Sequence, residues 1–263
     1  MMPVLCFDIE TVPDAAALRL LADADPDAAV LDDPALVARA QAARRERTGS
    51  DFLALHQHRI VAIACLLRDD TGMMVRCLGR DTDGEDKLLR LFFHQIERYT
   101  PQLVSWNGGG FDLPVMHYRC LVNGVSAPRY WESGDEDREF RWNNYLSRYH
   151  SRHLDLMDVL AMYSPRANAP LDELAKLCGF PGKMGMDGSQ VWQSFCDGGL
   201  AEIRAYCETD VANTYLMFCR FQLLRGHFSP ERYAQELALV RSTLEALPGE
   251  HWRAFLAAWP QPA

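Results

Sequence analysis

The chain has 263 residues, of which 48% are hydrophobic and 24% charged, with a formal net charge of −9. This length and composition suit one sizeable core, and no segment reaches the roughly 20 apolar residues that a membrane-spanning helix needs. The acidic charge argues against non-specific nucleic-acid binding through lysine and arginine, although cations bound to an acidic site reverse the local field.

Eight cysteines lie scattered along the chain without a C-x-x-C pair. Most of them stand in apolar stretches, a pattern typical of reduced, buried thiols rather than of a disulfide framework or a zinc site. The first residues carry no basic leader. We therefore expect a cytoplasmic protein.

The N-terminal third of the chain predicts an antiparallel meander. Residues 3–9 form a short apolar run typical of a buried strand, and residues 59–67 and 73–78 predict two more, joined by a turn at 69–72. Between the first two strands, residues 14–47 are rich in alanine and aspartate and predict helix, interrupted at Pro26 and Pro34.

The rest of the chain alternates helices and strands before it becomes helical. Apolar residues recur at helical spacing from Leu88 to Ile96, residues 102–106 predict a strand, and a helix opens at Leu113-Pro114. Residues 153–160 predict a fifth strand. Helices are predicted at about 171–178, 189–197, 200–224 and 230–246. This order predicts an α/β fold, with a mixed five-stranded sheet covered by helices.

Asp8 and Glu10 form the first group of residues that point to chemistry. Residues two apart on a strand face the same side, so both carboxylates project together at the end of an apolar strand. An unpaired carboxylate is costly beside a buried strand and invites a partner or a metal ion. The same Asp-x-Glu pattern recurs in polar loops, where solvated acids are expected, at Asp83/Glu85 and Asp137/Glu139.

The second group follows the strand predicted at 102–106. Asn107 precedes three glycines that allow a close backbone turn, and Asp112 lands near the start of a helix. Simple N-capping by Asp112 is the alternative explanation. The glycines do not match a dinucleotide-binding or P-loop pattern.

The third group is Tyr206 and Asp210, inside the helix predicted at 200–224. Residues four apart share one helix face, so the hydroxyl and the carboxylate can converge on one site. Glu202, Arg204 and Glu208 mark a solvated side of this helix, and the alternative is that the pair lies there.

Together these groups resemble the tyrosine branch of the DEDD exonuclease superfamily. Its Asp-x-Glu motif resembles Asp8 and Glu10, its Asn and aromatic-Asp motif resembles Asn107 with Phe111-Asp112, and its Tyr-x-x-x-Asp motif resembles Tyr206 and Asp210. Two further stretches, at 153–158 and 182–190, resemble stand-alone bacterial proteins related to the proofreading domain of family B DNA polymerases.

The resemblance implies a ribonuclease H-like fold and a two-metal, 3′→5′ hydrolysis of single-stranded DNA that releases nucleoside 5′-monophosphates. It implies one exonuclease domain over residues 1–263, with a helical insertion at about 14–57 and a helical extension at about 226–263. Two Mg²⁺ or Mn²⁺ ions would be held by Asp8, Glu10, Asp112 and Asp210, beside the catalytic Tyr206. Substrate contacts are expected at Thr11, Asn107 and Lys183.

Several alternatives stay open from the sequence. A sister branch uses His-x-x-x-x-Asp in place of the tyrosine motif, and this spacing occurs at His150/Asp155 and His153/Asp158. Asp155 is also a candidate structural or outer-sphere acid. An exoribonuclease on the same site and a non-catalytic nucleic-acid-binding module are the rival functions. The basic run at Arg44, Arg45 and Arg47 either guides a strand or is a solvated helix end.

Overall fold

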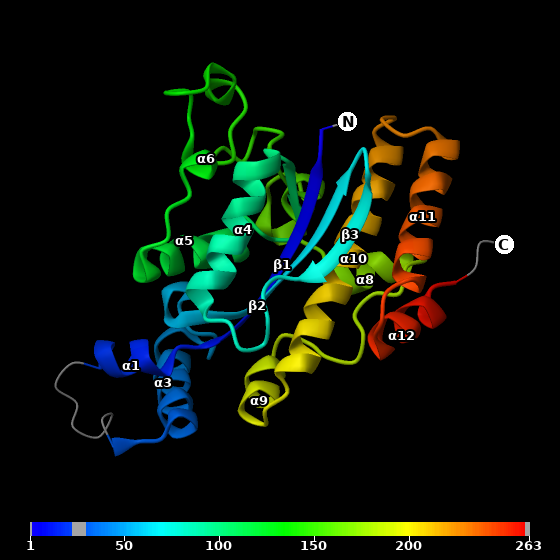
Figure 1. The fold of residues 1–263 in the computed structure, drawn as a ribbon. Coiled ribbons are helices and arrows are strands. Elements are labelled where there is room, and N and C mark those ends of the chain that lie inside the picture. The colour runs from blue at the N-terminus through cyan, green and yellow to red at the C-terminus, as the bar shows by residue number, and fades with distance from the viewer. Residues whose placement is uncertain (1, 23–29, 261–263) are drawn as a thin grey trace.

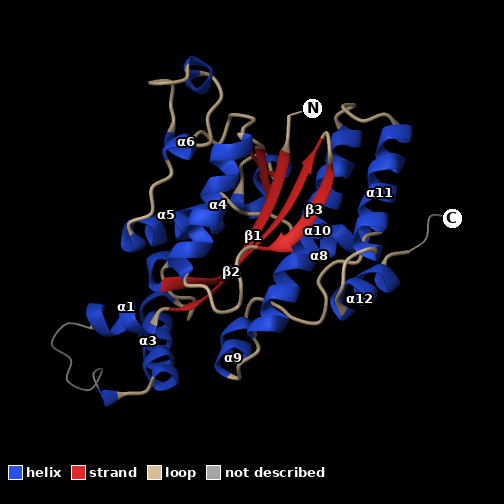
Figure 2. Ribbon diagram, in the orientation of Figure 1, coloured by secondary structure: helices blue, strands red, loops and turns tan. Residues whose placement is uncertain are grey.

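A single mixed sheet of five strands forms the centre of the computed structural model, which describes residues 2–22 and 30–260. Its strand order is β3-β2-β1-β4-β5, and Figure 2 shows the strands in red with helices around them. The first three strands pair antiparallel, whereas β4 and β5 run parallel to β1. The strands are β1 (Val4–Pro13), β2 (His58–Asp69), β3 (Gly72–Cys77), β4 (Gln102–Ser105) and β5 (His153–Asp155). The predicted mixed sheet is confirmed.

Helices cover both faces of this sheet (Figure 1). On one face lie α8 (Leu171–Leu177), α9 (Val191–Cys196), the long α10 (Leu200–Leu224), α11 (Pro230–Glu245) and α12 (Glu250–Ala258). On the other lie α4 (Glu85–Tyr99) and α5 (Asp112–Asn123). The side chains of β1 alternate between two cores, because Cys6 packs with the α10 side and Phe7 with the α4 side. Asp8 and Glu10 have the same parity as Cys6, so they face α10.

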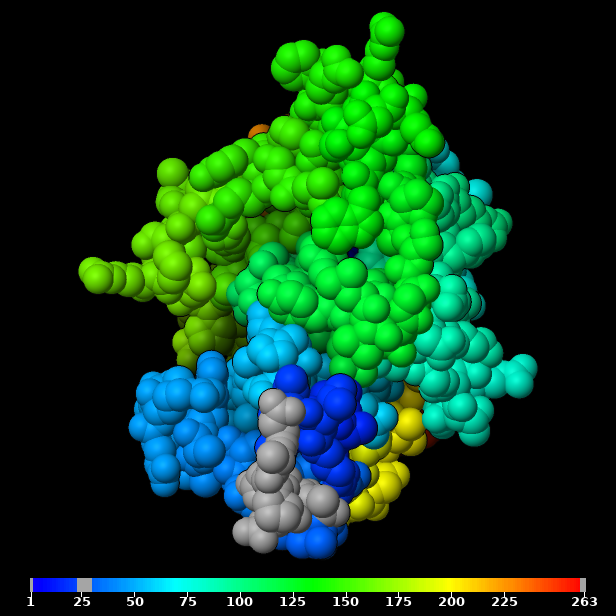
Figure 3. All heavy atoms as spheres, turned by 90° about the vertical axis from the view of Figure 1, so that its left-hand side faces the viewer, coloured from blue at the N-terminus to red at the C-terminus, as the bar shows by residue number. Residues whose placement is uncertain are grey.

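The segment inserted between β1 and β2 folds around a small core of its own. It contains α1 (Ala15–Leu21), α3 (Asp33–Thr48) and the short η1 (Leu55–Gln57). Asp14 and Asp32 cap the two helices with their side chains. The predicted interruption at Pro26 lies outside the described residues. In Figure 3 these helices form one end of the visible face, and the green segment after α5 forms the other.

One predicted strand, at residues 153–160, is wrong in its extent. Residues 153–160 are not one strand, because β5 ends at Asp155 and α7 (Leu156–Leu160) follows at once. The carboxylate of Asp155 accepts the backbone N–H of Asp158 at 3.3 Å and so caps that helix. α12 lies within the helical extension expected at about 226–263, and it packs Trp252 and Phe255 into the α10 core.

Short helical turns connect the larger elements. They are α6 (Pro128–Trp131), η2 (Arg138–Arg141) and η3 (Pro165–Ala167), in stretches too short to show a helical period. Among the described residues, no helix is long and apolar enough to cross a membrane.

Candidate active site

The register of the sheet places Asp8 and Glu10 beyond the end of β4. The parallel pairing of β1 with β4 runs only as far as Cys6 opposite Val104, so β1 continues past its neighbour. In sheets of this kind, the crevice outside the carboxyl ends of the strands is where ligands bind. On the other side, the antiparallel partners of the two acids are Ala64 and Ala62, whose small side chains leave room.

The carboxylates of Asp8 and Glu10 lie close together against α10. One oxygen of each, with the sulfur of Cys207, forms a group of atoms all within 4.8 Å of one another. The Cys207 thiol donates to the backbone oxygen of Asp8 at 3.4 Å. Burial, and then the neighbouring acids, raise the pKa of both carboxyls well above the ordinary value. Asp112 and Asp210 contribute to that repulsion, so all four acids share one site.

Asp112 opens α5 but does not cap it. The N-cap residue is Phe111, and no side chain supplies the cap hydrogen bond. The Asp112 carboxylate instead accepts the backbone N–H of Ile9 at 3.1 Å, between the two acids of β1. Burial raises the pKa of Asp112 to about 7. The N-capping alternative is therefore wrong.

The loop at residues 106–111 connects β4 to Asp112 and is held by hydrogen bonds to Asp155. The two carboxylate oxygens of Asp155 accept the backbone N–H groups of Asn107 and Gly109, each at 2.9 Å. Asn107 adopts a left-handed conformation with φ 67°. A Cβ on Gly108 would lie 2.3 Å from the Ser105 hydroxyl oxygen, so only glycine fits. Asp155 thus has the structural role that the sequence left as one option.

Tyr206 and Asp210 project from successive turns of α10 into the same site, and each is only 4% exposed. This overturns the alternative that they lie on the solvated side of the helix. The Lys183 ammonium donates to the Tyr206 hydroxyl and lies 3.3 Å from Oδ2 of Asp210. The other oxygen of Asp210 is buried and has no hydrogen-bond partner among the described residues.

The donor set fits divalent cations. Three carboxylates are buried, a fourth is partly buried, and Lys183 is the cation within ion-pair distance of Asp210 in the described structure. An orphaned carboxylate oxygen inside a protein is costly unless a proton or a metal ion compensates it. Carboxylate oxygens are the ligands that Mg²⁺ and Mn²⁺ prefer.

The comparison with known protein families agrees with this geometry. Residues 50–259 match the family described as a predicted 3′–5′ exonuclease related to the exonuclease domain of PolB. The chain belongs to this family. The exonuclease match contains Asp112, Tyr206 and Asp210, whereas Asp8 and Glu10 precede it. No curated protein matches the chain.

The residues of the two His-x-x-x-x-Asp pairs of this exonuclease are engaged in other contacts. The ring of His153 shares a hydrogen bond of 2.8 Å with the Ser105 hydroxyl. His150 accepts the backbone N–H of Asn144 at 3.0 Å. Asp158 pairs with Arg148, whose Nε lies 3.1 Å from a carboxylate oxygen. Each pair therefore has a structural explanation.

A cleft of about 660 Å³ opens beside Glu10. Thr11 and Asn107, two of the residues expected to contact substrate, line it together with Phe111, whereas Lys183 is not part of its lining. The Thr11 hydroxyl lies 3.1 Å from the ring of His58.

The inserted segment completes this cleft with residues that the sequence analysis did not single out. Phe52 is 51% exposed and stacks on His58, with ring centroids 4.8 Å apart. Trp192 of α9 lines the cleft too and packs against the core of the insertion. Isolated aromatic residues show no spacing signal, so sequence reasoning had no means of finding them.

Proposed function

We propose that this exonuclease is a metal-dependent enzyme of the tyrosine branch that removes nucleotides from the 3′ end of single-stranded DNA. The observation that supports it best is the convergence of Asp8, Glu10, Asp112 and Asp210, from a strand and two helices, beside the Tyr206 hydroxyl. The products are nucleoside 5′-monophosphates.

The four acids are the proposed ligands of two divalent cations, Mg²⁺ or Mn²⁺. Asp8 would serve both ions, Glu10 and Asp210 would hold the ion that activates the attacking water, and Asp112 would hold the other. When bound, such a pair of ions lowers the pKa of the attacking water and stabilises the departing 3′ oxygen.

Tyr206 and Lys183 act on the reacting groups from α10 and the loop before α9. The Tyr206 hydroxyl, held in place by the Lys183 ammonium, orients the attacking water toward phosphorus. Lys183 is a third exposed, so its charge remains available to a non-bridging phosphate oxygen.

The aromatic cleft supports a single-stranded substrate. Phe52, Phe111 and Trp192 offer ring faces, and unpaired bases stack on such faces with little dependence on sequence. Thr11 and Asn107 contact the terminal nucleotide from the floor of the cleft. A paired duplex end would have to unpair before its 3′ nucleotide gained the same contacts.

A cytoplasmic location is part of the proposal. All eight cysteines are free thiols, and six of them are buried. This arrangement suits a reducing compartment.

The deciding experiment follows the degradation of end-labelled oligonucleotides. A 5′-labelled single-stranded DNA is expected to shorten stepwise with Mg²⁺ or Mn²⁺, and to stay intact with chelator or with the Asp210→Asn variant. A 3′-labelled strand should release labelled mononucleotide first. The RNA strand of matched sequence should be cut more slowly. Faster cutting of RNA would show that RNA, and not DNA, is the preferred substrate. Undiminished 3′ trimming by Asp8→Ala would overturn the catalytic assignment.

A further inference from the structure

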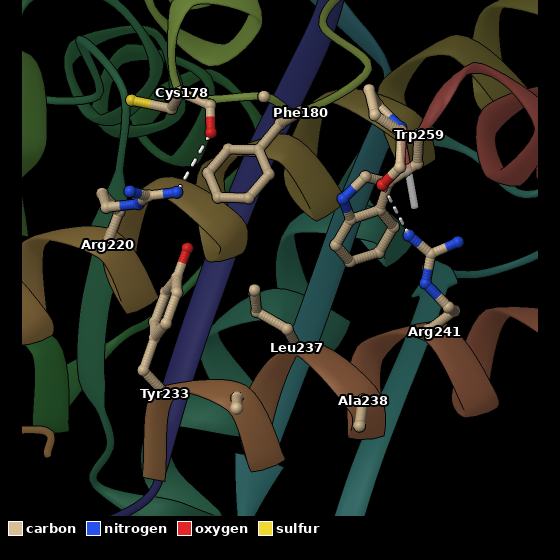
Figure 4. Close-up of a pocket in the computed structure, with 11 residues that line it drawn as sticks. Cys178, Phe180, Arg220, Tyr233, Leu237, Ala238, Arg241 and Trp259 are labelled. Carbon is tan, nitrogen blue, oxygen red and sulfur yellow. Dashed lines mark hydrogen bonds between the residues drawn. The ribbon is translucent and has the colours of Figure 1, made fainter. Parts of the chain in front are cut away.

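A second cavity, of about 560 Å³, lies between the end of α8, α10, α11 and the end of α12 (Figure 4). It shares no lining residue with the cleft beside Glu10. Arg220 in its wall follows Asp210 by ten residues on α10, which is about 15 Å along the helix. The cavity is therefore separate from the catalytic acids.

Flat apolar side chains form most of its surface. Phe180 and Trp259 are almost fully buried, and their rings meet edge to face with centroids 6.2 Å apart. Tyr233 and Leu237 of α11 close the opposite side (Figure 4). The volume lies within the range of about 300–1,000 Å³ that small-molecule sites occupy. A planar, apolar ligand matches these walls.

Two guanidinium groups line the cavity without a matching acid. The side chain of Arg241 lies over the ring of Trp259 at 4.3 Å and donates to the backbone oxygen of Pro260 at 3.3 Å. Arg220 donates to the backbone oxygen of Cys178 at 3.1 Å. None of the residues that line this cavity is acidic, and neither arginine forms an ion pair with a carboxylate of the described structure.

Two polar atoms at the same wall lack a well-formed hydrogen bond. The Nε of Arg220 and the hydroxyl of Tyr233 are buried without a well-formed hydrogen bond in the part of the chain described, although the two side chains lie against each other, with the guanidinium carbon 5.1 Å from the centre of the Tyr233 ring. Buried polar groups in native proteins are nearly always satisfied, so such a pair at a cavity wall indicates a missing partner. The absence of carboxylates here contrasts with a chain in which 36 acids outnumber 27 lysines and arginines.

We propose that this cavity is a binding site for a small planar aromatic molecule that carries a carboxylate or phosphate group. The ring stacks among Phe180, Tyr233 and Trp259. The anionic group accepts hydrogen bonds from the guanidinium groups of Arg220 and Arg241, whose fork geometry suits both head groups. A neutral ligand of the same shape leaves the two charges without a partner.

Isothermal titration of the full-length protein with three probes tests this site. 1-Naphthoate, 1-naphthyl phosphate and neutral 1-naphthylmethanol share one ring system and differ in charge. All titrations contain EDTA, so metal-bridged binding at the catalytic acids is excluded. We expect at least one anion to bind at least tenfold more tightly than the alcohol. Adenosine 5′-monophosphate is titrated in the same way against the wild type and Leu237→Trp, and only binding that Leu237→Trp abolishes counts toward a nucleotide as the ligand class of this cavity.

Three variants locate the binding. Arg241→Gln should lower the affinity for the anionic probe at least fivefold. Leu237→Trp, which fills the cavity, should abolish its binding. Arg253→Gln removes the same charge from an exposed position of α12 outside the cavity, and it should bind as the wild type does. Exonuclease activity and thermal unfolding show that each variant is folded. The proposal is overturned by equal affinity for the alcohol, by the absence of anion binding, or by unchanged affinity in both cavity variants.

Discussion

The carboxylate of Asp112 accepts the backbone N–H of Ile9 across 103 positions of sequence. This bond fixes the start of α5 against β1 between Asp8 and Glu10, so Asp112 has a structural role as well as its proposed catalytic one. The two roles respond differently to substitution.

Asp112→Asn should abolish nuclease activity while the fold remains. The amide oxygen still accepts the N–H of Ile9, but the neutral side chain is a poor ligand for Mg²⁺. We expect a fall in kcat of at least a hundredfold and a change in stability within about 1 kcal/mol. Asp112→Ala loses both roles and should cost about 1–3 kcal/mol in denaturant unfolding, because the buried N–H is left unpaired. Equal stability of the two variants would contradict the structural role.

Divalent cations should stabilise the wild-type protein through the four acids. Mn²⁺ at a hundred times its dissociation constant adds about 2.7 kcal/mol to the free energy of unfolding, which is visible as a rise in Tm. Asp8→Asn should lose this rise. Without metal it should be more stable than the wild type by on the order of 1 kcal/mol, because one of the repelling buried charges is gone. A lower Tm for metal-free Asp8→Asn would refute the repulsion argument.

Removing the side chain of Asp155 should loosen the loop before Asp112. Asp155→Ala leaves the N–H groups of Asn107 and Gly109 without their acceptors, which should cost about 3 kcal/mol. Activity should fall with it, since the loop positions Asp112. Asp158→Ala is the matched control, because it removes only a pair with the half-exposed Arg148 and should cost less than about 1 kcal/mol. Similar losses of stability in the two variants would contradict a stabilising role for the hydrogen bonds of Asp155 to Asn107 and Gly109.

Stability should depend on pH through His153. Burial lowers the pKa of this imidazole to about 4. In the unfolded chain this imidazole has an ordinary pKa near 6.5 and is protonated first as the pH falls. The free energy of unfolding is therefore highest above about pH 6.5 and decreases as the pH falls toward 4. The full loss is about 3 kcal/mol. His153→Asn should reduce the slope of the stability profile between these values without removing it, because burial also lowers the pKa of His117 to about 4, and an unchanged slope would exclude a contribution from His153.

Phe52 should contribute to substrate binding without touching the chemistry. Stacking of a base on an aromatic ring is worth about 1–3 kcal/mol, so Phe52→Ala should raise KM for single-stranded DNA roughly 5- to 100-fold. Neither kcat nor the Mn²⁺-induced rise in Tm should change much. Trp142, also exposed and outside the cleft, provides the control Trp142→Ala. An unaltered KM for Phe52→Ala would remove this ring from the substrate site.

Local pattern was enough to predict most of the elements. The apolar run before Asp8 and the helical spacing from Leu88 to Ile96 both predicted their elements correctly, because burial of one face imposes a period on the sequence. The same reasoning failed at residues 153–160. There Asp155 ends the strand and caps the next helix, while its carboxylate also binds the backbone N–H groups of Asn107 and Gly109. Contacts between residues so far apart in the chain leave no local pattern.

The sequence by itself determined the sheet, its covering helices and the identity of the candidate acids, because spacing on a strand or a helix fixes which side chains share a face. Only the tertiary structure decided how those acids meet. It placed Asp112 on Ile9 rather than at a helix cap, set Lys183 between Tyr206 and Asp210, and brought Phe52 of the insertion over the cleft. These contacts join residues far apart in the chain, and no local period records them.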